Sequence, residues 1–206
     1  VLTISGTGAM TDYASNSNVP WYSVCGKITS ATIAEGVTSV GNYAFYSCSS
    51  MATVSIPDGV TSINSYAFYN CSALTAISIP AAVTAIGEYA FRVCNGLTSV
   101  TIPDGVTEIS NYAFADCAAL TTISIPDGVT SIGISAFANC AALTSIDIPA
   151  GVTTISSNLF NGCTSLTAIT IPDGVTSINS SAFRSCSKLE SITLPQGVTS
   201  IGASAF

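Results

Sequence analysis

Eight cysteines form the first pattern that could carry chemistry, because they recur at a constant spacing of 23 residues. A metal site is disfavoured, since the chain has no C-x-x-C pair and no histidine. Stacked cysteines point the same way with Cβ atoms about 4.8 Å apart, beyond the roughly 3.5–4.5 Å usual in disulfides. We therefore expect a ladder of buried, reduced thiols that act as small apolar side chains. The ladder comprises Cys25, Cys48, Cys71, Cys94, Cys117, Cys140, Cys163 and Cys186.

An acidic column is the second such pattern, because most repeats place a carboxylate in the same turn-like position. A calcium ladder would need several oxygen ligands around each ion, whereas each repeat supplies one carboxylate. Ala81 and Ala150 interrupt the row, and the glycine–aspartate nonapeptide of calcium-binding β-rolls is absent. Pro-Asp-Gly is itself a turn sequence, since proline presets φ and glycine accepts positive φ. We expect turns and no metal at Glu35, Asp58, Asp104, Asp127 and Asp173.

The chain lacks the residues needed for catalysis, for nucleic-acid binding and for membrane insertion. A serine nucleophile needs a base, and the chain has no histidine. Glu108 and Asp116 are isolated carboxylates, unlike the paired acids of a glycosidase. The net charge of -7 disfavours binding to the negatively charged phosphate backbone of a nucleic acid. No apolar run approaches the roughly 20 residues that a membrane-spanning helix needs. We predict a protein that is not an enzyme, uses no cofactor, binds no nucleic acid and does not insert into a membrane.

These residues belong to a 23-residue repeat that must position them. All eight phenylalanines and seven of the eight prolines fall on its register. Such periodicity is the signature of a solenoid, in which each turn buries its apolar face against its neighbours. With strands about 4.8 Å apart, about eight turns would make a rod or arc roughly 40 Å long. The phenylalanine column comprises Phe45, Phe68, Phe91, Phe114, Phe137, Phe160, Phe183 and Phe206.

Each repeat contains signals for a strand, a turn and a return segment. Residues 74–79 have the L-x-x-I-x-I spacing of a short strand in a leucine-rich repeat. The Pro-Asp-Gly turn follows, after which Val60 and Ile63 point back to the interior. Residues 66–71 are expected to form a single helical or 3-10 turn that carries Phe68 into the core.

The repeat resembles the BspA-like leucine-rich repeat family of bacterial surface proteins. The resemblance rests on I-P-D-G-V-T-S-I-x-x-x-A-F-x-x-C, found at 56–71 and 171–186, and covers residues 31–206. It implies a right-handed, β-rich leucine-rich-repeat solenoid. Each 23-residue turn would hold one short concave strand, a turn, and a short 3-10, helical or extended convex segment.

Two regions follow from this register. Residues 1–30 resemble the segment that precedes the repeats in such proteins, and Trp21, Tyr22, Cys25 and Ile28 continue the register as a degenerate turn. We expect this segment to cap the first repeat. Residues 31–206 form about seven and a half repeats. The chain stops in mid-repeat, so we expect an array truncated at its C-terminus, monomeric within a longer protein.

Threonines form one candidate binding surface on the expected concave strand face. Threonine has a high β-propensity and keeps an exposed strand polar, which explains the column without a ligand. A protein or glycan could also be recognised through the hydroxyl groups, and regular threonine grids occur in ice-binding solenoids. The column comprises Thr75, Thr98, Thr121, Thr144 and Thr167.

Tyrosines form a second candidate surface, and they occur only in the first half of the array. Tyrosine offers a large contact area at a low entropic cost and is enriched in binding hot spots. A stack that merely covers the backbone is the alternative. Serine or asparagine replaces tyrosine in the later repeats, which favours an exposed position. The candidates are Tyr43, Tyr66, Tyr89 and Tyr112 in one column and Tyr46 and Tyr69 in another.

The family resemblance implies a secreted or cell-surface protein of a host-associated microbe. It also implies a binding or adhesion module that engages a host extracellular-matrix glycoprotein or a partner cell surface through the repeat surface. A structural spacer or stalk without a ligand is the alternative, and a glycan- or ice-binding solenoid that uses the Thr and Ser columns is a further one.

Overall fold

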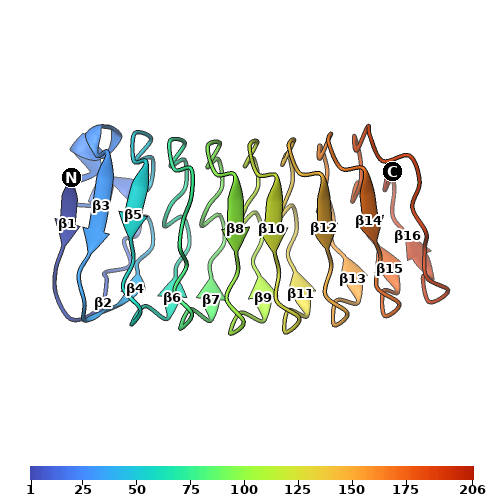
Figure 1. Cartoon of the computed structure of the whole chain (residues 1–206), viewed down its shortest axis with the longest axis horizontal. Helices are drawn as coiled ribbons and strands as arrows, with labels where there is room; N and C mark the ends of the chain where they lie inside the picture. Colours follow the sequence, from blue (N-terminus) through green and yellow to red (C-terminus); the bar gives the residue numbers. More distant parts are fainter.

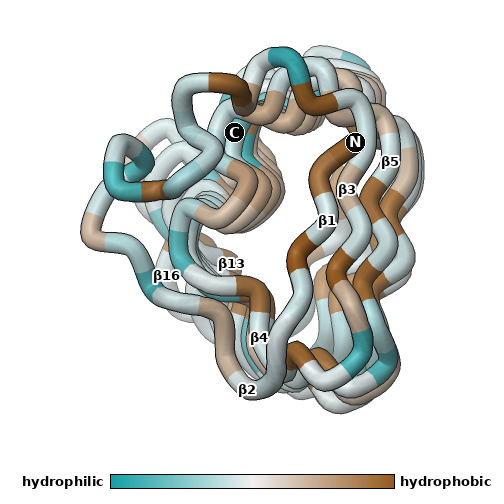
Figure 2. The backbone as a smooth tube through the Cα atoms, turned by 90° about the vertical axis from the view of Figure 1, so that its left-hand side faces the viewer, coloured by the Kyte–Doolittle hydropathy of each residue, from teal (hydrophilic) through white to brown (hydrophobic).

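The computed structural model describes residues 1–206 and forms the solenoid expected from the repeat. Parallel strands stack along its axis in two columns, which lie on two sides of the coil (Figures 1 and 2). From residue 30 onward, partners within a column are 23 residues apart, as in Thr122 with Ser99 and Ser200 with Ser177. The first column contains β1 (Leu2–Ile4), β3 (Ser30–Ile33), β5 (Thr53–Ser55), β8 (Ser99–Thr101), β10 (Thr122–Ser124), β12 (Ser145–Asp147) and β14 (Ala168–Thr170).

The second strand column was not assigned from the sequence, where this part of each repeat was left as a helical or extended segment. Its strands are only two to four residues long, and four of them follow a Pro-Asp-Gly turn. The column contains β2 (Gly8–Ala9), β4 (Val37–Val40), β6 (Ser62–Ile63), β7 (Ala85–Ile86), β9 (Glu108–Ile109), β11 (Ser131–Ile132), β13 (Thr154–Ile155), β15 (Ser177–Ile178) and β16 (Ser200–Ile201).

The helical or 3-10 turn expected at residues 66–71 is wrong, because this segment consists of consecutive tight turns. Two backbone residues in it, Tyr66 and Asn70, are left-handed with φ of 59° and 55°, which breaks any helix. The backbone N–H groups of this segment alternate between acceptors in the next repeat and acceptors within the same repeat. The N–H of Phe68 donates to the carbonyl of Ala90 in the next turn at 2.8 Å, whereas that of Tyr69 closes a local turn onto Tyr66. These turns therefore form a third line of hydrogen bonds between repeats.

Aromatic stacking organises the core. Seven phenylalanines from Phe45 to Phe183 are almost fully buried, and consecutive ring centroids lie 5.1 to 6.0 Å apart. Leucine, isoleucine and valine columns complete one continuous cluster along the array. A single repeat could not enclose these rings, so stability comes from contacts between neighbouring turns.

Six cysteines remain free, and their thiols line the core as expected. Each thiol also donates a weak hydrogen bond to the phenylalanine carbonyl 26 residues earlier, as Cys94 does to Phe68 at 3.2 Å. Burial raises the pKa of the Cys94, Cys117 and Cys140 thiols well above the usual value. These side chains are therefore neutral core groups that also satisfy buried carbonyls.

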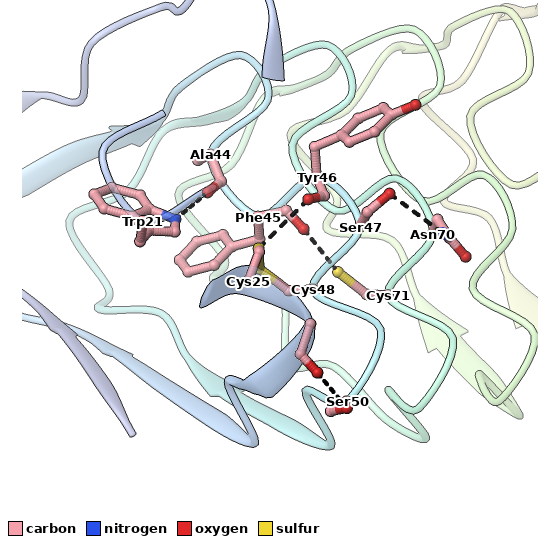
Figure 3. Close-up of a disulfide and its surroundings, with 11 residues drawn as sticks. Trp21, Cys25, Ala44, Phe45, Tyr46, Ser47, Cys48, Ser50, Asn70 and Cys71 are labelled. Carbon is pink, nitrogen blue, oxygen red and sulfur yellow. Dashed lines mark hydrogen bonds between the residues drawn. A yellow bond between two sulfur atoms is a disulfide. The ribbon is translucent and has the colours of Figure 1, made fainter. Parts of the chain in front are cut away.

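Cys25 and Cys48 depart from the expected reduced ladder, because they form a disulfide with Cα atoms 4.5 Å apart (Figure 3). The expectation is wrong here because Cys25 lies in the 3-10 helix η2 (Tyr22–Lys27) rather than in a regular turn of the coil. The assumption of equally spaced, parallel side chains does not hold at that position. The bond fastens the N-terminal segment to the first full repeat.

The N-terminal segment contacts the first repeats in three further ways. Strand β1 pairs with β3, and the Trp21 indole N–H donates to the carbonyl of Ala44 at 2.7 Å (Figure 3). One carboxylate oxygen of Asp12 accepts hydrogen bonds from the backbone N–H of Asn42 and the amide of Asn64, both at 2.8 Å. A short 3-10 helix, η1 (Asn16–Asn18), precedes η2.

The repeat register of Trp21 and Tyr22, which aligned Tyr22 with Phe45, is wrong by one residue. Tyr22 stands 23 residues before Phe45, yet its side chain is 44% exposed. Trp21 packs against Phe45 instead, with ring centroids 6.4 Å apart. The 3-10 winding of η2 rotates the side chains relative to an extended turn, so the neighbouring ring of Trp21 packs against the core while remaining partly exposed.

Candidate interaction surface

The candidate tyrosines form two ladders that follow the array axis, in the connection between the second strand column and the next repeat. In the first ladder, Tyr43, Tyr66, Tyr89 and Tyr112 stack with centroid spacings of 4.8, 4.6 and 4.7 Å and nearly parallel planes. In the second, Tyr46 and Tyr69 stack at 4.7 Å. We call these six residues the tyrosine ladders.

The two ladders touch each other along their length. Tyr66 and Tyr69 have centroids 5.9 Å apart and planes inclined by 46°. Tyr43 and Tyr46 repeat this arrangement at 5.6 Å and 47°. Because each ring face lies on the next ring, the ladders present ring edges and hydroxyl groups to solvent. All six side chains are half-buried.

The first ladder occupies a strained backbone position. The φ angles of Tyr43, Tyr66, Tyr89 and Tyr112 lie between 57° and 60°, in the left-handed region that large side chains rarely adopt. Later repeats fill this position with residues that adopt the region more readily or are smaller: Ser135, Asn158, Ser181 and Ser204. Tyrosine at these four positions therefore costs backbone energy that stacking must offset.

Charged groups mark the C-terminal end of the ladders. Arg92 occupies the repeat position that follows Tyr46 and Tyr69, and its guanidinium lies 5.7 Å from the ring centroid of Tyr89 and 5.6 Å from that of Tyr112. Its Nε donates to a carboxylate oxygen of Asp116 at 2.8 Å. Sequence reasoning did not select Arg92, because one arginine in a variable column gives no periodic signal.

Three of the tyrosine hydroxyls have a raised pKa. Partial burial, followed by the proximity of other tyrosines, raises the pKa of Tyr46 and Tyr66. Burial and the neighbouring Tyr112 do the same to the pKa of Tyr89. These three hydroxyls are therefore protonated at neutral pH and can donate a hydrogen bond to a partner.

The threonine column is exposed as expected, but three of its five hydroxyls already donate hydrogen bonds within the array. The Thr98 hydroxyl donates to the carbonyl of Thr75 at 3.3 Å, and that of Thr121 donates to Thr98 at 3.0 Å. Thr167 repeats the contact with Thr144. The hydrogen bonds run between repeats, so these side chains supply a structural contact that the strand-propensity argument did not include.

A longer threonine column runs along the second strand column and was missed from the sequence. All its members are exposed, and the Thr61 hydroxyl donates to the carbonyl of Thr38 at 3.2 Å. The signal was present in the repeated Gly-Val-Thr, which lies just after the turn. The column comprises Thr38, Thr61, Thr84, Thr107, Thr130, Thr153, Thr176 and Thr199.

The acidic column lies in exposed turns between the two strand columns. No group of three or more Cys, Asp or Glu side chains converges in a geometry that could hold a metal ion. Two hollows, of about 490 and 470 Å³, border this column at Asp173 and Asp104, respectively. None of the tyrosine ladder residues lines either hollow.

Solved structures of bacterial leucine-rich repeat proteins share this fold. The T. pallidum leucine rich repeat protein TpLRR is 24% identical, covers 92% of this chain and 72% of its own, and gives a TM-score of 0.54. A leucine-rich repeat protein from Bacteroides ovatus ATCC 8483 is 22% identical, with 100% and 72% coverage and a TM-score of 0.52.

A leucine rich cell surface protein from Faecalibacterium prausnitzii A2-165 is more similar in sequence. It is 35% identical over 79% of this chain, with a TM-score of 0.43. The present chain spans 59% of the length of that protein. No curated protein matches this chain. No helix in the structure has the length and apolarity needed to cross a membrane.

The family profile extends over nearly all of the array. The BspA type leucine rich repeat region matches residues 18–140 and 107–206, in 6 copies. This match agrees with the 23-residue register, the stacked phenylalanines and the two strand columns. The chain therefore belongs to the BspA-type leucine-rich repeat family.

Proposed function

We propose that this chain is a non-enzymatic protein-binding and adhesion module of a secreted or cell-surface protein, and that the tyrosine ladders contact its partner. One observation carries the proposal. Four consecutive repeats place tyrosine at a left-handed backbone position, where other repeats use serine or asparagine. Backbone strain of this kind is concentrated at functional sites.

The geometry suits recognition of a large partner. The ladders are held by stacked turns, so little conformational entropy is lost when a partner binds. Tyrosine edges and hydroxyls combine apolar area with hydrogen bonding, as in many protein interfaces. Tyr22 and Val24, which are 44% and 46% exposed, add apolar surface from η2.

An extracellular setting is supported by the disulfide between Cys25 and Cys48, since such bonds persist in oxidising compartments. The family resemblance favours a host extracellular-matrix glycoprotein or a partner cell surface as the ligand. A solenoid of this kind would act as a monomer within a longer repeat protein and bind through one side of the array.

The test is binding of the purified chain to immobilised matrix glycoproteins and a glycan panel. The double variant Tyr66→Ser/Tyr89→Ser removes the centre of the first ladder and introduces the residue that stands at 135 and 181. Saturable binding by the parent chain that the folded double variant loses is the expected result. The control is Thr98→Val/Thr121→Val, which removes two exposed hydroxyl groups from the first strand column and should bind normally.

A structural spacer is the alternative function. It predicts no saturable binding to any matrix protein or glycan by the parent chain. A ligand that binds the Thr columns predicts the opposite variant pattern, with loss in the threonine double variant and none in the tyrosine variant. The engaged threonine hydroxyls give this second mode less support.

A further inference from the structure

We infer that the tyrosine ladders recognise polyproline II segments, the left-handed extended helices formed by proline-rich and collagen-like chains. The inference rests on the proposed function, because it names the ligand class of the same surface. It is carried by the spacing of the rings, the groups that they leave exposed and the charge around them.

The spacing of the first ladder matches the period of this helix. A polyproline II chain has three residues per turn and a rise of about 3.1 Å, so its pattern repeats every 9.3 Å or so. Ring spacings of 4.6 and 4.7 Å place Tyr66 and Tyr112 about 9.3 Å apart, two repeats along the axis. A ligand parallel to the array would therefore meet equivalent tyrosines once per turn.

The exposed chemistry of the ladders matches the exposed chemistry of the ligand. A polyproline II chain makes no internal hydrogen bonds, so its carbonyl oxygens are free acceptors. The tyrosine hydroxyls can donate hydrogen bonds, and the stacked rings place them in a row at the same period. Ring faces are covered by their neighbours, with planes inclined by only 4° to 7°, which disfavours the flat stacking that sugars use. The ring edges remain for contact with proline rings.

The charge around the ladders favours a neutral ligand. The only cation beside them, Arg92, is paired with Asp116 at 2.8 Å. Glu88 adds a negative charge near Tyr66 and Tyr89, and the whole chain has a net charge of -7. Phosphorylated or acidic peptides would be repelled, whereas proline-rich chains carry no charge in their repeating unit.

The experiment measures binding of the full chain to an immobilised proline peptide of about nine residues, roughly 28 Å long. A collagen-like Gly-Pro-Pro triple helix forms a second arm, and a Gly-Ser peptide of equal length is the negative ligand. The double variant Tyr66→Phe/Tyr89→Phe retains the stacked rings and removes two donors. Tyr13→Phe, whose ring packs on Trp21 outside the ladders, is the matched control.

We expect saturable binding to one or both proline ligands, none to Gly-Ser, and a Kd raised about tenfold in the double variant because two hydrogen bonds are lost. The arm that binds identifies the source as a single proline-rich chain or a triple helix. Salt should change the Kd little, since no ion pair forms between the chain and the proline ligand.

Two results would overturn the inference. If neither proline ligand binds while the Tyr66→Ser/Tyr89→Ser variant still loses matrix binding, the ligand class is wrong and the proposed function stands. If both phenylalanine substitutions leave proline binding unchanged, the hydroxyl row is not the recognition element. Matrix binding that survives the serine double variant would refute the proposed function itself.

Discussion

Replacing Phe114 with alanine should destabilise the array more than any change at its ends. The Phe114 ring is fully buried and lies between Phe91 at 5.3 Å and Phe137 at 5.9 Å. Removing a buried phenylalanine costs about 3–5 kcal/mol in free energy of unfolding, since apolar contacts are lost and a cavity remains. The loss falls in mid-array, so it should also weaken the coupling between the two halves.

Phe206→Ala is the matched control in the same column. Its ring is 54% exposed and stacks on one neighbour, Phe183, at 5.6 Å. Partial burial limits its contribution to about 1 kcal/mol. Urea unfolding followed by circular dichroism would give both values, and the Phe114→Ala variant should also show a broader or split transition. Equal losses in the two variants, or a loss below about 1 kcal/mol at Phe114, would refute the stacked-core explanation.

Four further predictions follow from the backbone and the cysteines. Val93→Asn should stabilise the chain by about 1 kcal/mol in urea unfolding, because valine at a φ of 63° is strained and asparagine is already used at positions 70 and 139 of the column; a loss of stability would contradict this. Burial raises the pKa of the core thiols, so the folded state retains protons that the unfolded state releases. Stability should be constant below the thiol pKa of about 8.5 and fall by up to about 1.4 kcal/mol per thiol and pH unit above it, whereas a flat stability from pH 8 to 10 would argue against buried thiols. Reduction of the Cys25–Cys48 bond should lower stability by about 3 kcal/mol. A thiol reagent should reach only Cys186 in the otherwise native chain, and slowly, because burial raises its pKa to about 11; rapid labelling of the other free thiols would contradict the structure.

The position of each repeat was predictable, but its local conformation was only partly so. The phenylalanine and cysteine columns identify the residues that stack, because each needs the next turn to be buried. The segment at 66–71 was expected to form a single helical or 3-10 turn that carries Phe68 into the core. Hydrogen bonds to the next repeat, such as that from Phe68 to Ala90, override this local preference. Contacts of this kind link residues far apart in sequence, and local patterns do not encode them.

The candidate surface was also only partly predictable from the sequence. Spacing alone aligned Tyr43, Tyr66 and Tyr89 in one column, but it could not indicate their left-handed backbone or which part of each ring is exposed. Arg92 joins the tyrosines only because the coil brings its guanidinium beside two rings of the first ladder.

The sequence by itself determined the solenoid, its 23-residue register, the phenylalanine core and the family. The first three follow from periodicity, because a regular coil converts equal spacing in sequence into contact in space, whereas the family was indicated by the resemblance of the repeat motif. The tertiary structure alone decided the second strand column, the disulfide between Cys25 and Cys48, and the packing of Trp21 rather than Tyr22 against the core. The last two arise in the N-terminal segment, where the 3-10 winding of η2 interrupts the regular coil and repeat spacing no longer specifies side-chain direction.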